Sequence, residues 1–467
     1  MQEVVEEKQD LLARIRNGQE MTRNEKLRLI ANFSMPSILA QLSSIMMFFI
    51  DAAMVGSLGA RESAAVGLVE SSIWLFGGLM SACSLGFSVQ VAHAIGAKNF
   101  EGARHILRQA LVCGIIFSSF FMLIAIAVHG QLPYWLGGGD NIAPLSSQYF
   151  LVFSLAIPFL QLEGLSSSML KCSGNMRIPS ILNIGMCVLD VIFNYIFIFM
   201  CGMGVLGAAL GTFVAAFITC LLMLYFLVFR SDMLALRHRP GAFRPTMDTI
   251  RKAANIGAPM AFQHILMGGA QIVSTMIVAP LGDIAIAANS LAITVESICY
   301  MPGYGIADAA TTLVGQCIGA GQHAMTRSFA HLTVGMGMLT MLVMGALMFI
   351  FAPELMSVLT PVTAIRDVGA YSLRIEAFAE PMFAAAIVCN GVFIGAGDTM
   401  RPAIISMGCM WGIRLTLAAY LSTRYGLPGV WTAMAIELSF RGLLFLIRLM
   451  RGHWQKPLMQ PVAQPLD

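Results

Sequence analysis

The chain has 467 residues, of which 57% are hydrophobic and 11% charged, and its mean hydropathy is +0.76. A soluble protein of this size carries roughly 25% charged residues, so the composition excludes an ordinary soluble domain. The net charge of +3 is too small to indicate a nucleic-acid partner. The ten Cys lie singly, without a C-x-x-C motif, which argues against a disulfide framework or a zinc site.

Apolar runs long enough to cross a membrane follow one another along the chain. A transmembrane helix needs about 20 predominantly apolar residues. A charged, amphipathic segment, 1–32, comes first and a tail, 451–467, comes last. Between them we predict an all-α integral membrane protein with twelve transmembrane helices: 33–57, 66–92, 105–128, 145–171, 178–201, 204–229, 253–280, 285–316, 328–351, 369–396, 401–423 and 428–449.

Lys and Arg are distributed unevenly between the two sets of connections. Most of the 28 basic residues lie in the N-terminal segment, the even-numbered connections or the C-terminal end. The odd-numbered connections hold only Arg61, Arg366, Arg374 and Arg424. Because basic residues accumulate on the cytoplasmic side, we predict a multi-pass protein with both termini cytoplasmic, in the cytoplasmic (inner) membrane of a prokaryote.

The two halves of the sequence repeat each other at an offset of 223 residues. The matched positions include Asn32, Pro36, Gly59, Gly174 and Pro179, which correspond to Asn255, Pro259, Gly282, Gly397 and Pro402. Each half holds six predicted spans, so both halves start on the same side of the membrane. We therefore expect two six-helix bundles, 33–229 and 253–450, related by a pseudo-two-fold axis along the membrane normal. The basic segment 230–252 is expected to be their cytoplasmic linker.

Several motifs carry a family resemblance. They are Asp51-Ala-Ala-Met-Val-Gly56-Ser-Leu-Gly59, Leu281-Gly282-Asp-Ile-Ala-Ile-Ala287-Ala288-Asn289, Val314-Gly315-Gln316 and Gly395-Ala-Gly397-Asp398-Thr-Met-Arg401-Pro402. Over about residues 30–450 the sequence resembles the multidrug and toxic compound extrusion (MATE) transporters, whose superfamily also holds lipid and oligosaccharide flippases. The resemblance implies two six-helix bundles in a V, and export coupled to inward flow of H⁺ or Na⁺.

The first half offers a candidate cation-coupling site. Ionisable groups at bilayer depth are costly and usually have a partner or a task. Asp51 follows an apolar run, 45–50, and in the resembled family the Asp of this D-x-x-x-V-G stretch is a coupling residue. Such a carboxyl group can exchange a proton near neutral pH or bind Na⁺. The alternative is an interfacial Asp that reaches the outer surface.

Asp190 and Asn194 are spaced i, i+4 and so lie on one helix face. Some prokaryotic members of the resembled family carry Asn and then Asp at this spacing, whereas the order here is reversed. The pair is expected to face Asp51 and to share the bound cation, or else to be a polar packing pair. Thr212 matches a polar position of the family, although a Thr in a membrane helix commonly bonds its own backbone. We expect no other metal and no cofactor.

Further polar residues are candidates for substrate or a second ion: Glu296, Asp308, Glu163 and Gln271, with Glu70 a further buried carboxyl group. Glu376 and Glu380 are expected to be solvated at the outer rim. Arg414 is expected to pair with a buried carboxylate.

The function predicted is a secondary antiporter, not an enzyme. It would export small cationic or amphipathic organic compounds (multidrug efflux) in exchange for H⁺ or Na⁺ by alternating access. The alternative is a lipid or lipid-linked oligosaccharide flippase, which is disfavoured because only Arg414 and Arg441 are basic residues lying away from the span ends. A membrane-embedded enzyme would need a catalytic cluster, and a channel would not pump uphill. The expected partners are the substrate and the lipid bilayer, without nucleic acid, and the protein is expected to be a monomer.

Overall fold

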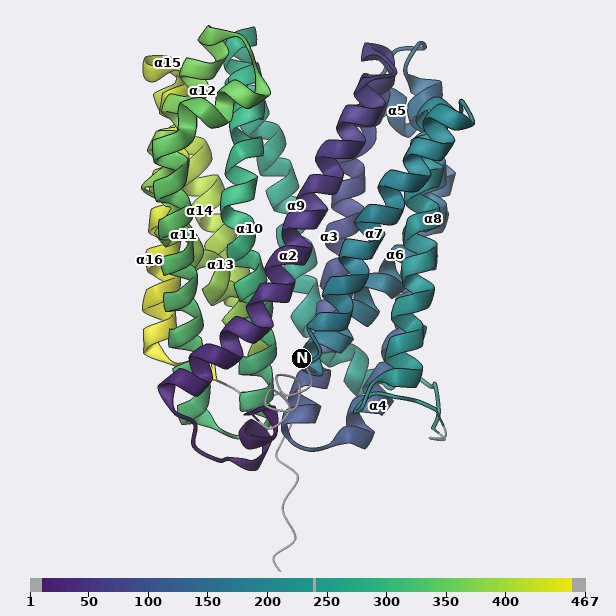
Figure 1. The fold of residues 1–467 in the computed structure, drawn as a ribbon, viewed down its shortest axis with the longest axis vertical. Coiled ribbons are helices and arrows are strands. Elements are labelled where there is room, and N and C mark those ends of the chain that lie inside the picture. The colour runs from purple at the N-terminus through teal and green to yellow at the C-terminus, as the bar shows by residue number, and fades with distance from the viewer. Residues whose placement is uncertain (1–10, 238–240, 456–467) are drawn as a thin grey trace, which may run out of the picture. The chain divides into compact units, whose positions relative to one another are not determined.

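A computed structural model describes residues 11–237 and 241–455. The described residues form helices and connecting turns, without a strand (Figure 1). Eleven helices are long and apolar enough to cross a membrane, and a bent helix pair is a twelfth candidate. The predicted all-α membrane fold is therefore confirmed.

The first six spans are formed by helices α2 to α8, with the short α5 between two of them. Their bounds are α2 (Arg23–Gly56), α3 (Ala60–Gly96), α4 (Phe100–Val128), α5 (Leu132–Trp135), α6 (Ala143–Cys172), α7 (Arg177–Tyr195) continued by a π turn (Ile196–Met200), and α8 (Gly204–Tyr225) continued by a π turn (Phe226–Arg230).

The second set begins inside the expected linker, because α9 starts at Met247. Its bounds are α9 (Met247–Val278) with a 3₁₀ turn (Ala279–Leu281), α10 (Asp283–Gly319), α11 (His323–Leu359), α12 (Thr363–Ala377), α13 (Glu380–Gly395), α14 (Met400–Cys409), the π turn η4 (Met410–Arg414), α15 (Leu415–Tyr425) and α16 (Leu427–Arg451).

Matched glycines of the sequence repeat adopt matched backbone conformations. Gly59 and Gly282 directly precede α3 and α10, with φ of 145° and 98°. Gly174 and Gly397 follow α6 and α13, with φ of 96° and 76°. A side chain is disfavoured at positive φ, so the turn at each position explains why both halves carry Gly there.

The tenth predicted span, 369–396, is not one continuous helix. It consists of α12 and α13, bent by 60° at residues 378–379. Pro381 stands in the first turn of α13. Proline has no backbone N–H and clashes with the carbonyl four residues earlier, so a helix running through from α12 would be interrupted here. Gly345 of α11 lies against the break, where an added Cβ would be 3.0 Å from the Ala377 carbonyl oxygen.

The described residues form two compact units, 43–261 and 11–42 together with 262–455. This division differs from the expected bundles, 33–229 and 253–450. Residues 33–42 pack with the helices of the second half, and residues 253–261 pack with those of the first half. Of the expected N-terminal segment, residues 1–10 lie outside the described residues, and so do residues 456–467 of the expected tail.

Close helix packing explains why the start of α2 belongs to the second unit. Gly305 of α10 lies against Ile38, and an added Cβ would be 2.7 Å from the Ile38 backbone nitrogen. One turn further along α10, Asp308 accepts a hydrogen bond from the Ser37 hydroxyl at 2.6 Å. The absence of a side chain at Gly305 thus allows the two helices to touch.

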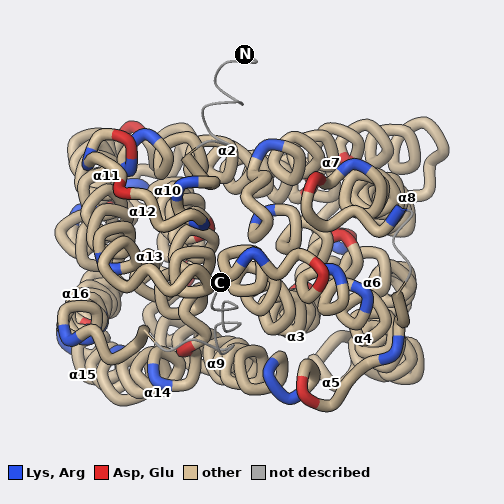
Figure 2. Tube along the Cα trace, turned by 90° about the horizontal axis from the view of Figure 1, so that it is seen from below, with Lys and Arg blue, Asp and Glu red and all other residues tan. Residues whose placement is uncertain are grey.

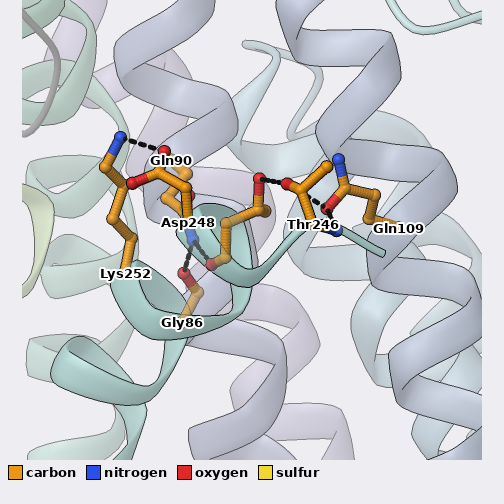
Figure 3. A network of polar contacts seen from close by, with 7 residues as sticks. Gly86, Gln90, Gln109, Thr246, Asp248 and Lys252 are labelled. Carbon is orange, nitrogen blue, oxygen red and sulfur yellow. Dashed lines mark hydrogen bonds and ion pairs between the residues drawn. The ribbon is translucent and has the colours of Figure 1, made fainter. Parts of the chain in front are cut away.

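The start of α9 is held on the first unit in the corresponding way. An added Cβ at Gly257 would be 2.7 Å from the Ala82 carbonyl oxygen of α3. Figure 3 shows the polar contacts beside this helix crossing: Gln90 donates to the carbonyl oxygens of Gly86 at 3.0 Å and Thr249 at 3.2 Å. The Thr246 backbone N–H donates to Gln109 at 2.9 Å.

Replacing Gly305 with Val is expected to lower the melting temperature of the purified protein. The added side chain must push the Ile38 backbone away, and overpacking of this kind costs about 1–3 kcal/mol, which corresponds to about 2–12 °C for a unit of this size. Gly335→Val in α11 is the control, because an added Cβ there has no neighbour within 4 Å. Equal melting temperatures for the two variants would contradict this packing.

Charged residues gather at helix ends and connections. Figure 2 shows the trace from below, with long uncharged stretches between the blue and red positions. The cytoplasmic side assigned to the basic ends remains a prediction.

Candidate functional site

An acidic cluster lies in the unit formed by residues 43–261. Asp51 comes from α2, and Asp190 and Asn194 come from successive turns of α7. The Asn194 amide nitrogen donates to Asp51 Oδ1 at 2.9 Å and to Asp190 Oδ2 at 3.0 Å. One carboxamide therefore joins two carboxyl groups, and the structure brings together the three residues that the sequence singled out.

The cluster has unused hydrogen-bonding capacity. Asp190 is fully buried, and its second oxygen has no hydrogen-bond partner among the described residues. The carbonyl oxygen of the Asn194 side chain, also buried, has none either. Two carboxylates at one site repel each other unless a proton or a cation lies between them. The free oxygens are the ligand type that a proton or Na⁺ requires.

A cavity of about 190 Å³ opens beside the cluster, within the same unit. Asp51, Asn194 and Thr212 line it, together with Glu70 and Tyr149. The Thr212 hydroxyl donates to the Ala208 carbonyl oxygen at 3.3 Å. This is the hydrogen bond to its own helix backbone that was the alternative to a role in the site. Glu70, expected to be buried, is exposed and is one of the residues lining this cavity.

An aromatic pair forms another part of the wall. The rings of Phe48 and Trp74 are stacked, with centroids 5.0 Å apart, and both line the cavity. Such a wall can pack against an aromatic or cationic compound. The sequence pattern did not single out these two residues.

Gly211 of α8 supports the cluster and was also missed from the sequence. An added Cβ at Gly211 would overlap Asn194 Oδ1 and would lie 2.7 Å from the Asn194 backbone nitrogen. The signal was present as Gly207-x-x-x-Gly211, a spacing typical of close helix approach in membranes. Without a side chain at this position, α7 and α8 can touch where Asn194 bridges the carboxyl groups.

A second cavity, of about 370 Å³, lies wholly among residues 263–445 of the other unit. Gln271 and Glu296, both predicted as candidates, line it. Arg414 and Arg441 line it as well. This cavity therefore combines a carboxyl group with two guanidinium groups.

The remaining two candidates lie elsewhere. Asp308 bonds Ser37, as described above, and is not among the residues lining either cavity. Glu163 of α6 is half-buried, and the Asn183 amide, oriented so that both of its ends are satisfied, donates to it at 2.9 Å. Both carboxyl groups thus have contacts between helices.

The expectation that Glu376 and Glu380 are solvated at the rim is wrong. Both are fully buried, on either side of the break between α12 and α13, and the carboxyl oxygens of Glu376 have no hydrogen-bond partner among the described residues. Arg414 forms no ion pair within 4.0 Å among the described residues, but it interacts electrostatically with the buried Glu296 and Glu376.

Comparison with known proteins identifies the family. The MatE family model matches residues 36–196 and 259–420. The chain belongs to the MATE family. The two matched segments begin 223 residues apart, at the offset of the internal repeat. As a MATE protein, this chain is a multi-pass membrane transporter and not an enzyme, as predicted.

Relatives of this MATE transporter match it along nearly its whole length. A probable multidrug resistance protein NorM from Thermotoga maritima is 25% identical, over 91% of this chain and 93% of its own. The multidrug resistance protein NorM of Burkholderia vietnamiensis is 26% identical, over 88% and 90%. The outward-facing structure of a multidrug resistance MATE family transporter superposes with a TM-score of 0.87 at 20% identity, covering 92% of this chain and 96% of that chain.

Proposed function

We propose that this MATE transporter is a multidrug exporter that exchanges small organic compounds for H⁺ or Na⁺ by alternating access. The observation that carries the proposal is the pair of carboxyl groups, Asp51 and Asp190, joined by the Asn194 amide beside a cavity. The names of the bacterial relatives support multidrug substrates.

The cluster supplies what ion coupling requires. A ligand shifts a conformational equilibrium only by its differential affinity for the two states. A proton or Na⁺ at Asp51 and Asp190 relieves the repulsion between them and would favour the conformation in which the cluster is closed. A cationic compound in the adjoining cavity would be attracted by the same carboxylates when they are empty, so ion entry would drive its release.

The membrane and the orientation proposed for this transporter rest on the sequence. The distribution of Lys and Arg supports a transporter in the cytoplasmic membrane of a prokaryote with both termini cytoplasmic. Because each chain holds both halves of the repeat, a monomer is sufficient.

Purified protein in liposomes tests the proposal directly. A pH gradient or a Na⁺ gradient is imposed alone, and uphill movement of the cationic dye ethidium is followed by fluorescence. We expect one of the two gradients to drive transport, and its collapse by an ionophore to stop it. Protein-free liposomes are the control. A transport rate that is independent of both gradients would rule out coupled export. Transport that only equalises the dye concentration across the membrane would rule it out as well.

A further inference from the structure

A third cavity, of about 320 Å³, lies in the unit formed by residues 43–261 and is lined by side chains of α2, α3 and α6. Phe48, Ile73 and Trp74 line both this cavity and the cavity beside Asp51. The two cavities therefore adjoin, and the stacked rings of Phe48 and Trp74 lie where they meet. We call the third cavity the inner chamber.

Gln161 of α6 lines the inner chamber and is fully buried. Its amide nitrogen donates to the Ser84 hydroxyl oxygen at 3.2 Å. The Ser84 hydroxyl in turn donates to the Met80 carbonyl oxygen at 3.1 Å, so Ser84 can only accept a hydrogen bond from Gln161. This order fixes the amide nitrogen on Ser84 and leaves Gln161 Oε1 as an acceptor without a partner among the described residues. A buried acceptor without a partner is costly, which indicates a donor that the protein itself does not supply.

Two glycines keep the inner chamber open. Gly77 of α3 and Gly164 of α6 line it, and an added Cβ at either position meets nothing within 4 Å. In contrast to Gly211, neither glycine is required by close helix packing. Gly is also less favourable than Ala inside a helix, so the open space is kept at a cost in stability. Its volume is that of a small ligand site, so a ring system can enter beside Gln161.

We propose that the inner chamber receives the uncharged end of an exported aromatic compound, and that Gln161 selects compounds with a hydroxyl or N–H donor at that end. The positive end of the compound lies in the adjoining cavity beside Asp51, and its rings pack against Phe48 and Trp74. The inference rests on the proposed export function and adds a specificity-determining residue to it.

Two dyes that differ in this one donor provide the test. Hoechst 33258 ends in a phenol hydroxyl, and Hoechst 33342 carries an ethoxy group at the same carbon, which cannot donate a hydrogen bond. Binding of each is measured by isothermal titration calorimetry with the purified transporter in lipid nanodiscs, without any gradient, and empty nanodiscs give the blank. Gln161→Leu should weaken Hoechst 33258 about tenfold, and Hoechst 33342 by less than about twofold.

Further variants separate the acceptor from the space. Gln161→Asn keeps the amide but withdraws its oxygen by one methylene, so its loss for Hoechst 33258 should be intermediate. Gly164→Leu fills the inner chamber and should weaken both dyes by more than about tenfold.

Each change has a matched control that lines neither cavity of this unit. Gln148→Leu changes an exposed residue of the same helix, α6. Gly185→Leu adds a side chain in α7, where an added Cβ also meets nothing within 4 Å. Both control variants should bind the two dyes as wild type does.

The outcomes decide the assignment. Equal weakening of the two dyes by Gln161→Leu, or no weakening of either, would overturn the proposal. Full affinity of Gly164→Leu would place the dyes outside the inner chamber and would overturn it as well, as would a wild-type protein that binds neither dye. If Gln161→Leu does not yield folded protein, Gln161→Asn with the same dye pair decides. Because binding needs no gradient, a failure of ion coupling would leave this result standing, and a failure here would leave coupled export untouched.

Discussion

Replacing Asp51 with Asn is expected to reduce ion-driven efflux to the level of protein-free vesicles. The substituted amide oxygen can still accept the hydrogen bond that Asn194 donates at 2.9 Å, so the geometry of the cluster is kept. An amide can neither release a proton nor balance the charge of a bound Na⁺. Efflux of ethidium from proteoliposomes under the effective gradient measures the loss.

Asp140→Asn is the control for this substitution, because Asp140 is exposed in the connection between α5 and α6. Its efflux should equal that of wild type. Full activity of Asp51→Asn would remove Asp51 as the coupling group. If Asp190→Asn were then inactive, the coupling role would belong to Asp190 instead.

Replacing Gly211 with Ala is expected to lower coupled efflux by about 10- to 100-fold. The new methyl group would overlap Asn194 Oδ1, so Asn194 must move, and we expect the loss of about one of its two hydrogen bonds to Asp51 and Asp190. A buried hydrogen bond to a charged group contributes about 1.5–3 kcal/mol. Two of them hold this cluster together. Initial rates of gradient-driven dye efflux measure the effect.

Gly185→Ala is the matched control, because Gly185 lies in α7 itself and an added Cβ there meets nothing within 4 Å. Its efflux should stay within about twofold of wild type, since Ala is a better helix former than Gly. Combining Gly211→Ala with Asn194→Ala should cost little more than either change alone. Additive losses in this double variant would show that Gly211 acts independently of Asn194.

Local composition was sufficient for the membrane helices and for the first acidic cluster. Twelve apolar runs predicted the spans, because hydrocarbon requires about 20 apolar residues wherever a chain crosses it. The i, i+4 spacing of Asp190 and Asn194 predicted one shared face. That this face meets Asp51 followed from the family resemblance, and the structure places them within hydrogen-bond distance.

Other features depend on contacts between segments far apart in the chain. Gly211 is important only because Asn194 lies against it, and Gly305 only because Ile38 does. A glycine in an apolar helix looks the same in sequence whether its neighbour is lipid or backbone. Similarly, Glu376 and Glu380 lie close to a helix end, and only the packing of neighbouring helices around the bent pair α12 and α13 decides that they are buried.

The sequence by itself determined the all-helical membrane fold, the duplication and the family, because hydropathy, matched Gly and Pro, and motif order are properties of the chain read along its length. Only the tertiary structure decided where α2 and α9 change from one unit to the other, and that Arg414 lines the same cavity as Glu296. The physical reason is that side-chain partners are set by close packing between helices, and an apolar run of a given length fits many such packings.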